Sequence, residues 1–198
     1  MTNRIAKQSR ETNETKISVE LNLDGQGDYD IDTGNGMFNH LLEQLSRHGM
    51  IDLSVNAKGD TDVGWHHLVE DCAIVIGKAL RQAVSDARGI TRIAHSFVPL
   101  DEALVLSAVD FGGRGYASID MELTDTDLGG LPAHMVHHFL ETLAREGSFN
   151  LHVRVISGIS NHHKAEAVFK SLARAMRTAL TIDIRLKDKS PSTKGSIR

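Results

Sequence analysis

The sequence predicts an α+β fold in which two related halves each place helices on one face of a small sheet. Three observations support this prediction. The chain has 198 residues, of which 40% are apolar and 24% charged, a balance typical of a globular protein. Residues 40–55 match residues 138–153, 98 positions further on, at 8 of 16 places. A second match follows in the same order, because residues 66–70 recur as residues 162–166 after 96 positions.

The elements of the first half follow from the spacing of apolar side chains. Residues 17–23 alternate apolar and polar side chains, which predicts a strand. Residues 40–48 place leucines at helical spacing, and Gly49 is typical of a helix C-terminus. Residues 51–55 again alternate apolar and polar side chains, which predicts a second strand. Residues 66–87 space apolar side chains by three and four, which predicts a second helix that ends before Gly89.

The second half repeats this order of elements. Its predicted elements are strands over 103–109 and 116–123, a helix opened by Pro132 and closed by Gly147, a strand over 151–156, and a helix from His162 to about Ile182. We therefore expect half-domains over residues 1–92 and 93–186 within one compact domain. The polar segment 187–198 contains proline and glycine, which predicts a tail or a binding loop.

Composition excludes several classes of protein. The apolar runs are far shorter than the ~20 residues needed to span a bilayer, and the polar first ten residues lack the apolar core of a signal peptide. The single cysteine, Cys72, can form neither a disulfide framework nor a thiolate metal site. The formal net charge is −4 and no basic tract is present, which argues against nucleic-acid binding. We expect a soluble, cytoplasmic protein that binds neither nucleic acid nor membrane.

Histidine is unusually frequent, with 11 residues, and it occurs twice in a His-His-x-x-Glu motif. In a helix the first His and the Glu of this motif face the same way, whereas the second His is rotated by ~100°. Each motif can therefore offer a His/Glu pair to one metal ion and a lone His to another. One more His from the other helix of each half completes two sets of ligands: His40, His67, His162 and Glu166 in one, and His66, Glu70, His138 and His163 in the other.

Three imidazoles and one carboxylate suit octahedral Mn²⁺, with Fe²⁺ or Zn²⁺ as substitutes, and the count predicts two ions per chain. The ligands alone do not define a reaction. A hydrolase with a two-metal centre and a non-catalytic metal-storage shell therefore stay open beside a lyase.

These motifs resemble the imidazoleglycerol-phosphate dehydratases of histidine biosynthesis, and the resemblance covers nearly the whole chain. It rests on residues 66–71 and 161–170, and further on residues 10–15, 33–40, 44–49, 88–92, 99–103, 113–114 and 191–195. The resemblance implies a duplicated half-domain, with the helices of both halves packed between two four-stranded sheets. It also implies a homo-oligomer of 24 subunits with active sites between subunits. The implied activity is Mn²⁺-dependent dehydration of D-erythro-imidazole glycerol phosphate to imidazole acetol phosphate.

The resemblance also implies the roles of individual residues. Glu14 would be the catalytic group that takes a proton from the carbon next to the one that loses its hydroxyl. The substrate-binding residues would be Glu14, His48, Arg92, Arg114, Lys170, Ser192 and Lys194, with the cationic side chains and Ser192 on the phosphate. Residues 187–198 would then be a phosphate-binding tail.

Two segments depart from the family's pattern. Val63, Gly64 and Trp65 stand where family members often have acidic residues before the first His pair, which puts the carboxylate support of the ligand imidazoles in doubt. Residues 113–115 read Gly-Arg-Gly in place of a more usual Ser-Gly-Arg-Pro. Neither departure removes a ligand or a charged substrate contact.

Overall fold

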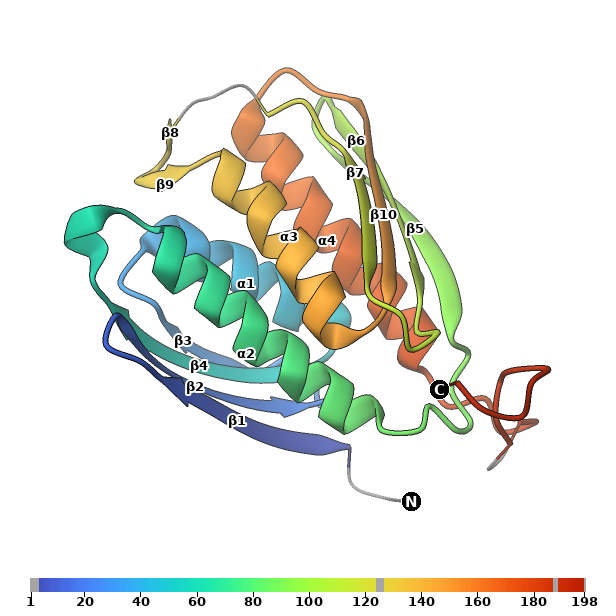
Figure 1. Cartoon of the computed structure of the whole chain (residues 1–198). Coiled ribbons are helices and arrows are strands. Elements are labelled where there is room, and N and C mark those ends of the chain that lie inside the picture. The colour runs from blue at the N-terminus through green and yellow to red at the C-terminus, as the bar shows by residue number, and fades with distance from the viewer. Residues whose placement is uncertain (1–3, 124–126, 187–188, 198) are drawn as a thin grey trace.

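The computed structural model describes residues 4–123, 127–186 and 189–197. Within these ranges two four-stranded mixed sheets lie on the outside and four α-helices lie between them (Figure 1). This arrangement confirms the predicted α+β fold with helices enclosed by two sheets.

The two halves share one topology. The first half contains β1 (Ile5–Glu11), β2 (Thr15–Asn22), β3 (Tyr29–Asp32), α1 (Gly36–Gly49), β4 (Asp52–Gly59), the short 3₁₀ helix η1 (Thr61–Val63) and α2 (His66–Val84). The second half contains β5 (Ile93–Leu100), β6 (Ala103–Asp110), β7 (Tyr116–Asp120), β8 (Asp127–Leu128), β9 (Leu131–Pro132), α3 (His134–Gly147), β10 (Asn150–Ser157) and α4 (Asn161–Leu180). The strand orders β1-β2-β4-β3 and β5-β6-β10-β7 make β1 equivalent to β5, β2 to β6, and β4 to β10.

The core forms where helices of different halves meet. Alternate residues of β2 and β6 are buried under the helices, as a sheet with one covered face requires. Helix α2 packs on α3, and α1 packs on α4. The ring of Phe139 lies 5.4 Å from that of Phe38 and 5.6 Å from that of Phe169, between centroids. The helices of each half therefore complete the core of the other.

Local capping explains why helix ends differ from those predicted. Helix α1 begins at Gly36, before residue 40, because the Asn35 side chain accepts a hydrogen bond from the Phe38 N–H. Helix α2 ends at Val84, before Ala87, because Ser85 and Ala87 have positive φ. Helix α3 begins at His134, and Pro132 belongs to β9 instead of opening the helix.

Other differences concern the end of α4 and several strands. Helix α4 ends at Leu180, and Ile182 pairs with Ile90 in an isolated bridge. Strand β7 ends at Asp120, short of residue 123. Five strands were not predicted from the sequence: β1, β3, β5, β8 and β9. Strands β1 and β3 are largely exposed edge strands, so they show no apolar alternation.

The C-terminal segment contacts the end of the first half and a loop of the second half. The Gly89 N–H donates to the Lys189 carbonyl, and Ile197 closely approaches Gly113, where a Cβ would collide with it. Residues 187, 188 and 198 of the expected tail lie outside the described residues. Among the described helices, none has the length and apolar character needed to cross a membrane.

Candidate metal centre

The first turns of α2 and α4 carry the two His-His-x-x-Glu motifs. On α4, Nε2 of His162 lies 2.8 Å from a carboxylate oxygen of Glu166. The same oxygen lies 3.1 Å from Nε2 of His40 on α1. The ligand atoms of His40, His162 and Glu166 all lie within 4.8 Å of one another, so we call these three residues group one.

A second cluster has the same composition. On α2, Nε2 of His66 lies 3.8 Å from the carboxylate of Glu70, and Nε2 of His138 on α3 lies 3.5 Å from it. The rings of His66 and His138 stack with centroids 4.6 Å apart. His66, Glu70 and His138 form group two. In each group the single His comes from one half of the chain, and the His/Glu pair comes from the other half.

The chemistry of both groups fits a divalent cation. Burial lowers the pKa of His138, which favours the neutral imidazole that binds metals. Its Nε2 atom is buried without a hydrogen-bond partner among the described residues. Burial opposes ionisation of Glu166, but hydrogen bonds from Lys170 and His40 outweigh it and lower the pKa of Glu166 to about 2. Each group therefore combines two imidazoles with one carboxylate, a set of nitrogen and oxygen donors that Mn²⁺, Fe²⁺ and Zn²⁺ accept.

The second His of each motif lies apart from both groups. Nδ1 of His67 lies 3.1 Å from the Asp60 carboxylate, and Nδ1 of His163 lies 2.7 Å from that of Glu102. These contacts raise the pKa of both histidines, and the bond to His163 lowers the pKa of Glu102 to about 2. Within one chain the structure thus brings together three members of each expected set and leaves out His67 and His163.

The carboxylates on these two histidines have a further effect. An oxygen partner on Nδ1 fixes the orientation of an imidazole ring and directs Nε2 toward a metal ion. His67 thus has a carboxylate on Nδ1, from Asp60, although Val63, Gly64 and Trp65 offer none. Neither Asp60 nor Glu102 was among the site residues expected from the sequence. No periodicity marks them, because both lie in loops at strand ends.

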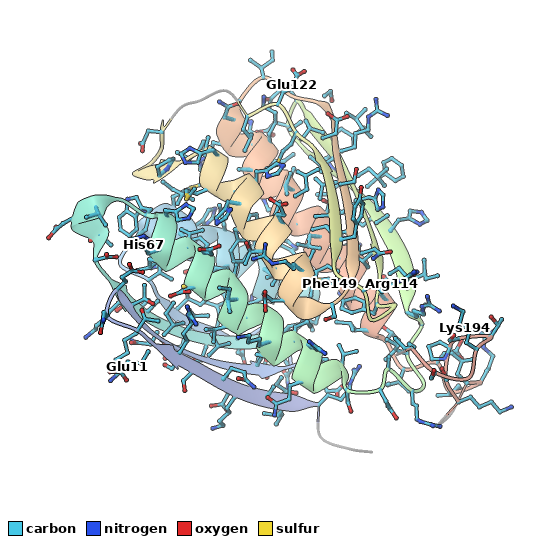
Figure 2. All side chains as sticks on the ribbon, in the orientation of Figure 1. Glu11, His67, Arg114, Glu122, Phe149 and Lys194 are labelled. Atoms are coloured by element: carbon cyan, nitrogen blue, oxygen red, sulfur yellow. The ribbon has the colours of Figure 1, made fainter. Side chains whose placement is uncertain are left out.

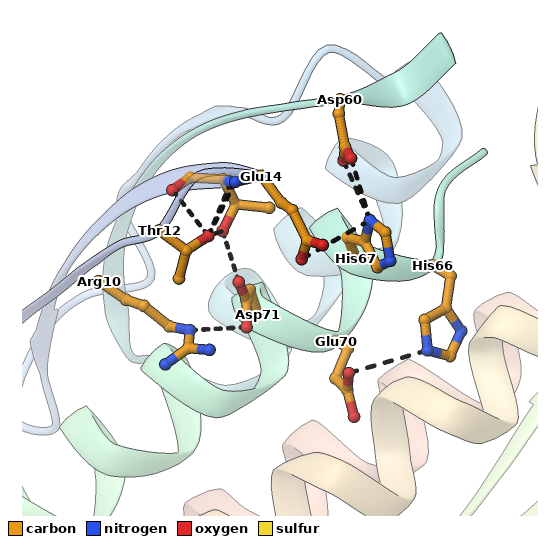
Figure 3. A network of polar contacts seen from close by, with 9 residues as sticks. Arg10, Thr12, Glu14, Asp60, His66, His67, Glu70 and Asp71 are labelled. Atoms are coloured by element: carbon orange, nitrogen blue, oxygen red, sulfur yellow. Dashed lines mark hydrogen bonds and ion pairs between the residues drawn. The ribbon is translucent and has the colours of Figure 1, made fainter. Parts of the chain in front are cut away.

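Glu14 lies in the turn between β1 and β2 and faces the same histidine (Figure 3). Its carboxylate lies 3.9 Å from Nδ1 of His67, and its side chain is 55% exposed. Glu14, Asp60 and His67 thus form a third cluster of closely spaced polar groups. Glu14 therefore belongs to the neighbourhood of His67 and lies outside groups one and two.

Two of the expected substrate-binding residues lie near group one. Nζ of Lys170 lies 2.7 Å from the carboxylate of Glu166, one helical turn away. Nε2 of His48 on α1 lies 3.1 Å from the Gln44 side-chain oxygen. Burial lowers the pKa of His48, and the positive charge of Lys170 lowers it further.

The remaining expected phosphate contacts lie elsewhere. Arg92 donates two hydrogen bonds to the Asp110 carboxylate and one to the Pro191 carbonyl, which attaches it to the C-terminal segment. Ser192 accepts a hydrogen bond from the Lys194 N–H. Figure 2 shows Arg114 and Lys194 at the opposite end of the molecule from His67. One chain therefore does not bring these residues to the cluster that contains Glu14.

Comparison with known proteins identifies the family. The family model described as imidazoleglycerol-phosphate dehydratase matches residues 33–176. The imidazoleglycerol-phosphate dehydratase of Dehalococcoides mccartyi strain CBDB1 is 49% identical over 197 residues, which cover 100% of this chain and 99% of the relative. The chain belongs to the imidazoleglycerol-phosphate dehydratase family. The chain is accordingly a hydro-lyase of histidine biosynthesis, as the resemblance had implied.

Further relatives agree with this family. The imidazoleglycerol-phosphate dehydratase of Chromohalobacter salexigens is 44% identical over 197 residues, all of this chain and of the relative. The crystal structure of the Staphylococcus aureus enzyme gives a TM-score of 0.82 at 31% identity, covering 90% of this chain and 99% of that one. The crystal structure of the Pyrococcus furiosus enzyme gives a TM-score of 0.80 at 33% identity, and the match covers 94% of this chain and 98% of that one.

Proposed function

We propose that this chain catalyses the Mn²⁺-dependent dehydration of D-erythro-imidazole glycerol phosphate to imidazole acetol phosphate in the cytoplasm. The observation that supports this most is the pair of three-residue groups, each with two imidazoles and one carboxylate within 4.8 Å. Each group would hold one Mn²⁺, and Fe²⁺ or Zn²⁺ would be substitutes. When bound, the ions would supply Lewis-acid polarisation of the imidazole ring of the substrate.

A neighbouring subunit would complete each ion site. His67 and His163 lie outside both groups, and each is oriented by a carboxylate on Nδ1. We propose an assembly of 24 subunits in which His67 joins group one of a neighbour and His163 joins group two.

The chain's own residues would perform the proton transfer and bind the phosphate. The exposed Glu14 carboxylate would take the proton from the carbon next to the one that loses its hydroxyl. Arg92, Arg114, Lys170, Ser192 and Lys194 would bind the phosphate by charge-assisted hydrogen bonds, and His48 would line the substrate site. Because Lys194 and His67 lie at opposite ends of the folded molecule (Figure 2), a site that contains both would again need two copies of the chain.

The deciding experiment gives the metal-free protein Mn²⁺ and imidazole glycerol phosphate and measures formation of the enolisable ketone. We expect ketone formation only with metal, and about two ions per chain in the fully active enzyme. Release of orthophosphate would support a hydrolase instead, and metal uptake without turnover would support a storage shell. A stoichiometry near one ion would contradict the paired sites.

Light scattering with and without a chelator tests the assembly. Ligands that bind only the assembled state stabilise it, so chelation is expected to shift the protein toward smaller oligomers. A fully active monomer would contradict the proposed sites between subunits.

A further inference from the structure

A buried carboxylate connects helix α2 to the turn that carries Glu14 (Figure 3). Asp71 follows Glu70 on α2 and is only 6% exposed. It accepts a hydrogen bond from the Thr15 hydroxyl and, at 2.7 Å, one from Nε of Arg10. Arg10 lies near the end of β1 and Thr15 begins β2, so Asp71 holds the two strands on either side of Glu14.

Other contacts hold the backbone of the turn. The Thr12 hydroxyl accepts hydrogen bonds from the N–H groups of Glu14, at 3.1 Å, and Thr15, at 3.0 Å. The Asp60 N–H donates to the Glu14 carbonyl at 3.0 Å. The main chain at Glu14 is therefore held at both its N–H and its carbonyl, while its carboxylate stays exposed near His67.

The second half of the chain shows that the fold does not need this network. Thr15 begins β2 as Ala103 begins β6, and Arg10 pairs with residue 17 as Val98 pairs with residue 105. Asp71 follows the motif glutamate as Ala167 does in the repeat. The positions equivalent to Arg10, Thr15 and Asp71 are thus Val98, Ala103 and Ala167, which are all buried and apolar.

A buried carboxylate needs partners that compensate for its lost hydration, and an apolar replacement of similar volume is often as stable. The polar network occurs in the half whose hairpin carries Glu14, and the apolar one occurs in the other half. We propose that Asp71 is a positioning residue, which holds the Glu14 turn on α2 so that the Glu14 carboxylate meets the substrate at a fixed place. This inference rests on the proposed role of Glu14 in proton transfer.

The first test replaces Asp71 by Asn, which keeps the shape but removes one acceptor. We expect Asp71→Asn to lower kcat by about 10-fold or more, with KM and the Mn²⁺ content nearly unchanged, because small misplacements of a reacting group are costly. Ser171→Ala is the matched control, since it removes a buried hydrogen bond to Ser107 in the second half. The control is expected to lower stability without lowering kcat.

Hydrogen exchange provides a readout that does not depend on turnover. In Asp71→Asn the amides of Glu14 and Thr15 are expected to exchange faster, while the amides of α2 keep their protection. Thr15→Val and Thr15→Ser serve if Asp71→Asn does not fold. The valine variant loses the hydroxyl and should reproduce the kcat loss, and the serine variant retains the hydroxyl and should restore kcat.

Double variants separate positioning from general destabilisation. In a Glu14→Gln background, Asp71→Asn is expected to cost less than about twofold further in kcat, because its effect acts through Glu14. If Asp71→Asn lowers kcat by the same factor in the Glu14→Gln background as in the wild type, the positioning role is overturned while the function of Glu14 stands. If Glu14→Gln alone keeps wild-type turnover, the proposed proton acceptor is wrong and the positioning role fails with it.

Discussion

Glu14 and Glu102 occupy equivalent places in the two halves, each directly before the second strand of a hairpin, yet their surroundings differ. Glu102 accepts hydrogen bonds from His163 and from the N–H groups of Ile159 and Ser160, and its pKa falls to about 2. Glu14 has a more open carboxylate, 3.9 Å from His67.

The difference depends on one further residue. In the first half Asp60 contacts the motif histidine, the task that Glu102 performs in the second half. Glu14 therefore keeps an exposed carboxylate, as its proposed role in proton transfer requires, while Glu102 holds His163 and its loop. Equivalent carboxylates of a duplicated structure thus have different contacts in the two halves, and we propose a supporting role for Glu102 and a reactive one for Glu14.

Exchanging each glutamate for glutamine tests this contrast with the largest expected effect. Glu14→Gln should lower kcat by about 10²–10⁴-fold with normal metal content, because the amide keeps the shape but cannot accept the proton. Glu102→Gln should leave the kcat of the fully Mn²⁺-loaded enzyme much closer to wild type. Steady-state kinetics with metal analysis measures both. Equal losses in the two variants would abolish the distinction.

For Mn²⁺ affinity we expect Glu102→Gln to have a larger effect than Glu14→Gln, the reverse of the order expected for kcat. Glu102→Gln and Asp60→Asn each remove the carboxylate that orients a motif histidine, so we expect Mn²⁺ affinity to fall by about 10–100-fold, with activity restored by excess Mn²⁺. Glu14→Gln should bind Mn²⁺ almost normally. Titration of the metal-free proteins with Mn²⁺ measures this, and unchanged affinity in Glu102→Gln would show that His163 needs no support.

Helix packing offers a comparison at equivalent positions of α2 and α4. Gly77 on α2 lies so close to α3 that an added Cβ would come within 2.8 Å of the Glu146 Cβ, whereas its repeat partner, Ala173, already carries a Cβ. We expect Gly77→Ala to lower the free energy of unfolding by about 1–3 kcal/mol through overpacking. Ala173→Gly should cost about 1 kcal/mol through backbone entropy. Urea unfolding of the metal-free proteins tests this, and a stabilised Gly77→Ala would refute the close approach.

The smallest expected effect concerns pH. Glu102 raises the pKa of His163 above its ordinary 6.5, so the pair stabilises the metal-free protein below that pH. The stabilisation is lost as pH rises through the raised pKa, and also as pH falls toward the Glu102 pKa of about 2. The Tm of chelated protein should thus decrease by about 1–2 °C between pH 6 and 8.5, and less in Glu102→Gln. A Tm change independent of Glu102 would contradict this prediction.

The sequence by itself determined the duplication, the fold class and the residues of the two His-His-x-x-Glu motifs. These features depend on local periodicity, because apolar spacing sets helix or strand and an i, i+4 separation places His and Glu on one helix face. The edge strand β1 was not predicted because it lacks such periodicity: only Ala6 of its seven residues is buried, so apolar and polar side chains do not alternate along it.

Only the tertiary structure decided which of the expected ligands meet within one chain. The packing of α1 on α4 and of α2 on α3 places His40 beside Glu166 and His138 beside Glu70, as the expected ligand sets had paired them. The same packing leaves His67 and His163 apart, each against a carboxylate from a loop. Asp71 likewise acquires its partners only because α2 lies on the β1–β2 hairpin, since residues 56 and 61 positions distant meet there. Contacts between residues so far apart depend on how whole elements dock, which periodicity along the chain does not encode.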